Sequence, residues 1–323
     1  MLFLGKKMEE QGMDPAIAGL TKIGPSKWKE DFYSPSVTSP VPTPSSPGRR
    51  ICGNIQCAGS WSAPWRNRKR PIFEAQWGCS GRCVLALVRA ALQRELGDGI
   101  VDEAVSHQHR MPLGLLLLSQ GWITQSQLQD ALRIQREQGG RIGEILISEC
   151  GVDAGHVARG LSLQWNRPML SSNGFSPQSM ALVMPKALVE QFGMLPLRVA
   201  GSRILYVGFE DRPDASALFG LEQMSELRVE SGLVKTEEYC AARRSLLDEE
   251  KGIETHEESY GEIDALAARI TAVLEQKQPV ASRLVRVRQF YWLRLWLEAK
   301  SLGGFGSLPR SREDMMDYVF RRS

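Results

Sequence analysis

Two stretches of the chain match each other at a spacing of 29 residues. They are PLGLLLLSQGWITQSQLQDALRIQ, residues 112–135, and RIGEILISECGVDAGHVARGLSLQ, residues 141–164. Gly114 recurs as Gly143 and Gln135 recurs as Gln164, and five residues separate the two copies. Self-similarity at a fixed period indicates one supersecondary unit that is used twice.

Each copy predicts a pair of helices. A Gly-led apolar stretch is followed by a turn and an amphipathic helix, which Thr124 caps in the first copy and Asp153 in the second. Residues at helical spacing then share one face: Leu128, Ala131, Leu132 and Gln135 in the first copy, and Val157, Gly160, Leu161 and Gln164 in the second. One interpretation is that these faces form the core between two packed helical hairpins.

A second interpretation is a ligand site. Gly114 and Gly143 precede strong helix formers, where glycine costs about 1 kcal/mol relative to alanine, and bare backbone suits the close approach of a ligand. Gln135 and Gln164 end apolar faces with an amide that can form hydrogen bonds. Arg141 opens the second copy and can bind a phosphate or a guanine edge.

The doubled pattern resembles the N-terminal domain of type II secretion and type IV pilus assembly ATPases, the protein E family. The resemblance runs from about Met111 to Leu247 and includes LVMPKALVEQFGMLPLRVAGSRILYVGFEDRPD, residues 182–214. In one branch of that family the doubled motif binds cyclic di-GMP. The resemblance therefore implies a cyclic di-GMP site formed by Gly114, Trp122, Leu128, Leu132, Gln135, Arg141, Gly143, Leu161 and Gln164.

The sequence departs from the family pattern in both copies. Pro112 stands where the first copy should open with arginine, and proline offers neither charge nor donor; Arg110 lies two residues away and would approach from another direction. In the second copy, Cys150 stands where glycine is usual and Gly151 where Trp or Leu is usual. Two hypotheses stay open: retained cyclic di-GMP binding, or a ligand-free module that docks on a partner protein.

We expect a protein that is not an enzyme. The ATPases of the family need a phosphate loop of the form G-x-x-x-x-G-K-[ST], and the sequence contains no such segment. No serine, cysteine or carboxylate arrangement typical of catalysis is recognisable either. The expected role is that of a regulatory domain without the motor.

Four cysteines predict a metal site. Cys52 and Cys57 form one pair and Cys79 and Cys83 a second, with 21 residues between the pairs. Four thiolates suit tetrahedral zinc, so we expect a structural zinc-ribbon or treble-clef-like module over residues 50–96. The segment between the pairs is expected to form a hairpin with a basic tip, residues 66–70. The alternatives are four free cysteines, or a zinc-dependent module that binds nucleic acid through this tip.

The whole chain reads as an α+β multidomain protein: a small zinc-finger-like module, the doubled helical motif with an α/β subdomain, and C-terminal helices. The predicted parts are a disordered Pro/Ser-rich tail (1–49), the module (50–96), a linker (97–110), the secretion-ATPase-type domain (111–247) with its α/β half (176–247), an acidic linker (248–260), and a C-terminal helical region (261–323). Within the last part, RLVRVRQFYWLRLW, residues 283–296, is expected to lie on a helix that packs on another domain or contacts a membrane surface or partner.

Composition limits the classes of partner. A net charge of +3 over 323 residues does not indicate nucleic acid or membrane. The longest apolar run, residues 115–118, is too short to span a bilayer, and the first residues lack a signal-peptide core. We therefore expect a cytoplasmic protein whose partner belongs to secretion or pilus machinery. His107 and His109 are expected to be solvated.

Overall fold

The computed structural model describes residues 52–57, 71–97, 110–201, 203–249, 254–298 and 315–323. The predicted tail, most of the linker over 97–110 with both of its histidines, and the basic segment 66–70 lie outside the described residues. No helix within the described ranges is both long enough and apolar enough to cross a membrane.

The doubled motif is helical, as predicted. Its helices are α3 (Leu113–Ser119), α4 (Gln125–Gln138), α5 (Ile142–Ser148) and α6 (Ala154–Trp165). Thr124 caps α4 by accepting a hydrogen bond from the Gln127 amide, and Asp153 caps α6 by accepting one from the His156 amide. Both predicted caps are confirmed.

The two copies pack across each other. Helix α3 of the first copy lies against α6 of the second, and α4 lies against α5. Matching residues of both copies fill the core between them: Leu113, Leu117, Ile123, Leu128, Ala131, Ile145, Leu146, Val152 and Val157. The pairs Leu117 and Leu146, Ile123 and Val152, and Leu128 and Val157 are each 29 positions apart, so the packing repeats with the sequence.

The next part combines helices and strands in an α/β unit, within the range 176–247 for which the sequence predicted an α/β half. It contains α7 (Pro177–Met180), α8 (Lys186–Phe192), β3 (Leu195–Ala200), β4 (Ile204–Phe209), α9 (Ala215–Ser225), β5 (Arg228–Leu233) and α10 (Thr236–Leu247). The sheet order is β3-β4-β5, with β3 antiparallel and β5 parallel to β4. Gly193 ends α8 with φ 60°, in the left-handed region that favours glycine.

The C-terminal region is a sheet, so the prediction of helices after residue 280 is wrong. Its elements are β6 (Glu254–Tyr260), α11 (Ile263–Lys277), β7 (Ala281–Val287), β8 (Phe290–Trp296) and β9 (Met315–Arg322), in the sheet order β6-β9-β8-β7. Residues 254–260, expected to be linker, form a strand at the sheet edge.

Burial on both faces of this sheet explains the error. Along β8, Tyr291 and Leu293 belong to one core, while Phe290 and Trp292 belong to another. A strand covered on both faces reads as a continuous apolar run, which periodicity cannot separate from a buried helix. In the β7–β8 turn, Arg288 has a φ of 53°. Glycine or asparagine usually occupies such a position, and either residue would have indicated a hairpin in the sequence.

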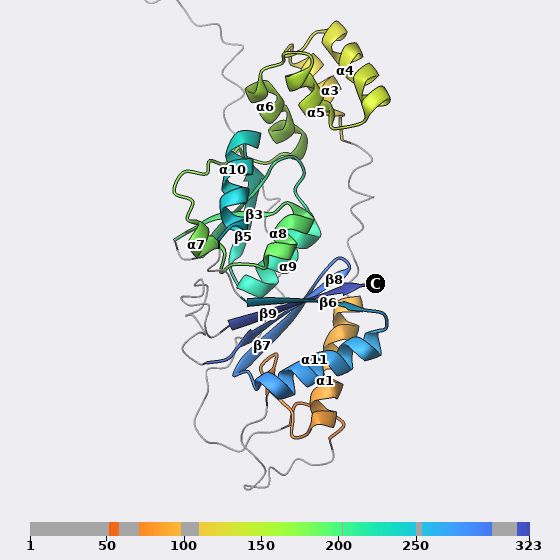
Figure 1. Cartoon of the computed structure of the whole chain (residues 1–323), viewed down its shortest axis with the longest axis vertical. Coiled ribbons are helices and arrows are strands. Elements are labelled where there is room, and N and C mark those ends of the chain that lie inside the picture. Colours follow the sequence, from red (N-terminus) through yellow and green to blue (C-terminus); the bar gives the residue numbers. More distant parts are fainter. Residues whose placement is uncertain (1–51, 58–70, 98–109, 202, 250–253, 299–314) are drawn as a thin grey trace, which may run out of the picture. The chain divides into compact units, whose positions relative to one another are not determined.

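The N-terminal module shares a core with this sheet. It consists of β1 (Ile72–Phe73), β2 (Gln76–Trp77) and α1 (Gly81–Gly97). Helices α1 and α11 lie side by side (Figure 1). The β1–β2 hairpin turns at Glu74 and Ala75, both with positive φ, while the predicted basic tip lies outside the described residues.

Candidate functional site

Two glutamines tie the copies of the doubled motif together. Gln135 Nε2 donates to the Gly140 carbonyl oxygen at 2.9 Å, and Gln164 Nε2 donates to the Met111 carbonyl oxygen at 2.9 Å. Each glutamine thus reaches the residue just before the opening of the other copy. The two acceptors are themselves 29 positions apart, so the arrangement has approximate two-fold symmetry.

The openings of the two copies lie close together. A Cβ atom on Gly143 would lie 3.5 Å from Cδ2 of Leu113, so the first turns of α3 and α5 are neighbours. We call the polar surface around these turns the opening edge; it consists of residues 110–112, Gln135, residues 140–141 and Gln164. It contains every polar residue of the predicted ligand site.

The two glycines serve helix packing in this structure. A Cβ atom on Gly114 would lie 2.5 Å from Leu128 Cδ1, and one on Gly143 would lie 3.1 Å from Val157 Cγ1. Each glycine therefore lets the short helix approach the long helix of its own copy. Leu128 is 5% exposed and belongs to the core. The predicted site residues that keep exposed or partly exposed surface are Trp122, Leu132, Gln135, Arg141, Gly143, Leu161 and Gln164.

Arg141 is engaged by acidic residues. Its Nη1 donates to Glu210 Oε2 at 3.1 Å and lies 3.6 Å from Glu144 Oε1, while 53% of the side chain is exposed. Partial burial opposes the charge, but Glu210 and Asp211 raise the pKa of Arg141 above its ordinary value. The guanidinium is therefore charged and accessible, and a carboxylate occupies a position that an anionic ligand would take.

Arg110 lies beside the second glutamine. Its guanidinium carbon is 4.2 Å from the centroid of the Trp165 ring, and its Nη1 donates to the Gln164 carbonyl oxygen at 3.4 Å. Arg212 also approaches this ring, at 5.8 Å. Arg110 thus places a cation next to Pro112, at the start of the first copy. The sequence had indicated only that Arg110 lies two residues away from this position.

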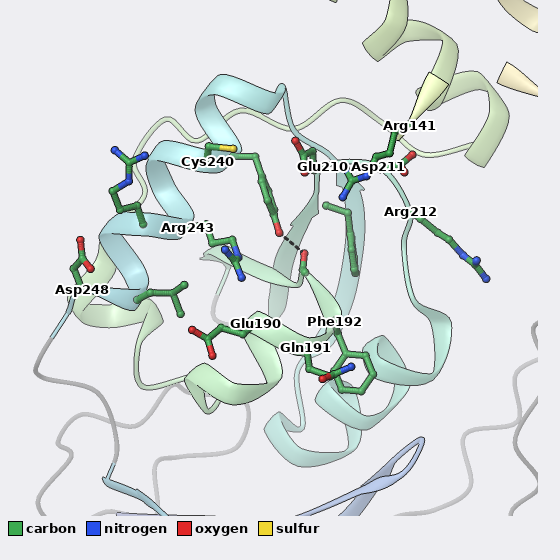
Figure 2. Close-up of a pocket in the computed structure, with 15 residues that line it drawn as sticks. Arg141, Glu190, Gln191, Phe192, Glu210, Asp211, Arg212, Cys240, Arg243 and Asp248 are labelled. Atoms are coloured by element: carbon green, nitrogen blue, oxygen red, sulfur yellow. Dashed lines mark hydrogen bonds and ion pairs between the residues drawn. The ribbon is translucent and has the colours of Figure 1, made fainter. Parts of the chain in front are cut away.

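A polar cavity of about 690 Å³ adjoins Arg141, and sequence reasoning missed it. Figure 2 shows Glu210 and Asp211 near Arg141, with Arg243 and Cys240 contributed by α10. Burial raises the pKa of Asp211. The lining comes from α8, the loop after β4, α10 and Arg141 before α5, segments that only the fold brings together.

The four predicted metal ligands come together. The Sγ atoms of Cys52, Cys57, Cys79 and Cys83 all lie within 4.8 Å of one another. Cys57 and Cys79 are 3.5 Å apart, and Cys79 and Cys83 are 3.6 Å apart. A disulfide needs about 2.05 Å, whereas sulfur atoms bound to one tetrahedral zinc are about 3.8 Å apart. All six cysteines of the chain are free thiols in this structure.

The surroundings of Cys83 suit an anionic sulfur, whereas burial and the neighbouring thiols raise the pKa of Cys79 to about 12. Asn54 Nδ2 donates to Cys83 Sγ at 3.5 Å, and Cys83 lies in the first turn of α1, where the helix dipole favours negative charge. Burial opposes ionisation of Cys83, but hydrogen bonds from Ser80, Asn54 and neighbouring thiols lower its pKa to about 6. Four sulfur ligands leave no open position for catalysis, so the geometry fits a structural site.

Comparison with known proteins gives partial matches. No family model matches the chain. Over 111 residues, 34% of this chain, the sequence is 32% identical to bacteriophage adsorption protein B of Escherichia coli strain K12. The same values hold for bacteriophage N4 adsorption protein B of Escherichia coli O157:H7. The chain spans 15% of the length of these curated relatives.

Two solved structures give further partial matches. A structure of MshE with cdg is 22% identical and covers 42% of this chain and 98% of its own, with a TM-score of 0.35. The N-terminal domain of XpsE is 16% identical and covers 41% of this chain and 92% of its own, with a TM-score of 0.30. These scores are too low to transfer a function.

Proposed function

We propose that the opening edge binds cyclic di-GMP, and that the protein is a non-enzymatic receptor or adaptor that links this ligand to a secretion, pilus or other regulatory partner. Cyclic di-GMP consists of two identical nucleotide units related by two-fold symmetry. The observation that supports its binding is the pair of glutamine bonds, because the two bonds repeat with the sequence and give the edge an approximate two-fold symmetry that matches the symmetry of the ligand. The resemblance of the doubled motif over residues 112–135 and 141–164 agrees with this choice.

The proposed contacts follow from the accessible groups. Arg141 is the cation for a phosphate or a guanine edge. Gln135 and Gln164 supply amides, and Leu132, which is 36% exposed, supplies apolar surface for a base. Gly114 and Leu128 act through packing, because they hold α3 against α4 behind this edge.

Calorimetric titration of the full chain with cyclic di-GMP tests the proposal. We expect micromolar or tighter binding, which Arg141→Ala weakens by about tenfold or more because a charge-assisted hydrogen bond is lost. Arg228→Ala is the matched control, since Arg228 is an exposed arginine on β5 whose charge pairs with Glu230. Absence of heat with the wild-type chain at high micromolar ligand would refute the proposal.

Two alternatives predict that negative result. A ligand-free module of a type II secretion or type IV pilus-like system would bind a protein component of that system and would not bind cyclic di-GMP. A zinc-dependent nucleic-acid binder would instead show DNA binding that weakens steeply as salt rises. The basic segment that would serve the second alternative lies outside the described residues.

We propose further that Cys52, Cys57, Cys79 and Cys83 hold one structural zinc ion. The support is the donor set: four thiols at mutual distances that fit one tetrahedral ion. Mass-spectrometric metal analysis of the purified chain should find one zinc per chain, and Cys79→Ser should remove it. Cys240→Ser is the control, because Cys240 is an exposed thiol outside the cluster.

A further inference from the structure

The four cysteines belong to a module that is joined to the far end of the chain. Cys52 and Cys57 precede the β1–β2 hairpin, Cys79 follows it, and Cys83 lies in the first turn of α1. The Gly53 amide donates to the Trp77 carbonyl oxygen at 2.9 Å, which ties the first pair to the hairpin. An ion held by all four sulfurs would fix three local elements at once.

The hairpin is bonded to strand β7, more than 200 residues later. The Glu74 amide donates to the Ser282 carbonyl oxygen at 3.1 Å, and Ser282 Oγ donates to the Ile72 carbonyl oxygen at 3.0 Å. Phe73, between Ile72 and Glu74, is 2% exposed and belongs to the core beneath the sheet. β7 is an edge strand, so the hairpin protects an edge that would otherwise be open.

Helix α1 completes the same core. One group of buried residues joins its apolar face to α11 and to the sheet: Val84, Val88, Leu92, Leu266, Ile270, Leu274, Tyr291 and Leu293. The far end of α1 is bonded as well, because Glu95 Oε2 accepts from the Arg286 amide at 3.2 Å. The core therefore needs residues from both sides of the inserted segment 110–249.

We infer that the four-cysteine zinc site is a clasp: it holds the N-terminal module in the shape that closes the C-terminal sheet, so zinc occupancy controls the folding of a domain built from the described parts of residues 52–97 and 254–323. The inference rests on the proposed zinc binding. The two short strands of the hairpin, with two residues each, cannot hold a two-stranded ribbon together alone. Zinc supplies the missing constraint, since binding free energy at a structural site is folding free energy.

Hydrogen exchange of the full chain tests the clasp, with and without a zinc-selective chelator and again after zinc is restored. We expect chelation to speed exchange by about tenfold or more in α1, α11 and β7, and zinc to reverse the change. Helices α4 and α6 of the doubled motif serve as internal controls that keep their protection. A change confined to residues 52–83, with α11 and β7 still protected, would overturn the clasp while leaving the zinc site intact.

Two further measurements separate the possible failures. Metal analysis of the same sample decides whether zinc is present, and its absence refutes the proposed site itself. Ser282→Ala removes the bond to the Ile72 carbonyl without touching a ligand. We expect this variant to keep its full zinc content but to exchange faster in β7, whereas unchanged exchange in β7 would count against the link between the hairpin and the sheet.

Discussion

At the scale of single residues, the two arginines of the opening edge differ in how they are held. Arg141 pairs with a carboxylate, while Arg110 lies on the Trp165 ring and bonds to the backbone of Gln164. Pro112 removes the cation that the resemblance expects in the first copy. Arg110 is the described cation nearest to that opening in sequence, and it contacts the glutamine of the opposite copy.

Arg110→Ala should therefore weaken cyclic di-GMP binding about as strongly as Arg141→Ala, by roughly tenfold or more. The physical reason is that each substitution removes the cation of one half of the opening edge: Arg110 beside the first copy, or Arg141 at the start of the second. Calorimetric titration of both variants beside Arg228→Ala measures the effect. If Arg110→Ala binds like the wild-type chain while Arg141→Ala does not, only one half of the edge grips the ligand through arginine.

Glu210→Gln should have the opposite effect on affinity. Glu210 accepts a hydrogen bond from Arg141, so it competes with any anion for that guanidinium. Removal of the negative charge should tighten binding by up to about fivefold, the range of a partly exposed ion pair. Glu144→Gln is the milder control, because Glu144 lies farther from Arg141, at 3.6 Å. Weaker binding by Glu210→Gln would show that Glu210 positions Arg141 for the ligand.

Local chemistry was predictable at this scale, but chemistry assembled by the fold was not. Thr124, Asp153 and the four cysteines follow from residue type and spacing within short segments. The contact between Arg141 and Glu210 joins positions 69 residues apart, and nothing in either segment indicates it. Gly114 and Gly143 differ from these cases. The sequence showed that glycine lowers helix stability at these positions, but in this structure close helix packing, and not a ligand, explains why glycine is there.

At the scale of helices and strands, the C-terminal sheet contains a buried ion pair. Arg294 on β8 and Asp317 on β9 face each other and form two hydrogen bonds of 2.8 Å, with side-chain exposures of 3% and 0%. Arg294 Nη2 also donates to the Val183 carbonyl oxygen at 3.1 Å. The pair thus joins two strands and the loop between α7 and α8.

Asp317→Ala should lower the free energy of unfolding by about 3–5 kcal/mol, because it leaves the buried Arg294 charge uncompensated. Urea unfolding followed by circular dichroism measures the change. Glu230→Ala, which breaks the exposed pair with Arg228, should cost no more than about 1 kcal/mol. The double variant Arg294→Met, Asp317→Leu should recover much of the loss. Equal stability of Asp317→Ala and Glu230→Ala would contradict the buried pair.

The strands of this sheet also show where prediction from sequence stops. In the α/β unit, glycines with positive φ mark turns between elements: Gly193 ends α8, and Gly201 lies between β3 and β4. In residues 281–296 the same signals are missing, because Arg288 forms the turn and both faces of the strands are buried. Pairing with β9, which follows a segment outside the described residues, could not be read from local pattern.

At the scale of the whole molecule, the C-terminal sheet is shared between two cores. One face packs on α1 and α11, while Val285, Val287, Phe290, Trp292 and Val319 on the other face join the core of the α/β unit. One close approach is at Gly220 of α9, where a Cβ atom would lie 2.6 Å from Val287 Cγ2. The inserted segment is therefore packed against the domain that flanks it in sequence.

Gly220→Val should separate these cores. The added methyl groups meet a β-branched side chain and, at 3.5 Å from the Cβ position, the Arg286 carbonyl oxygen, so α9 has to move away from β7. Overpacking of this kind lowers the free energy of unfolding by about 1–3 kcal/mol. Urea unfolding followed by circular dichroism and by tryptophan fluorescence measures this loss, since Trp292 lies in this core. Gly261→Val is the matched control, because a Cβ atom there has no neighbour within 4 Å. If both variants unfold at the same urea concentration, the contact between α9 and β7 does not couple the inserted segment to the sheet.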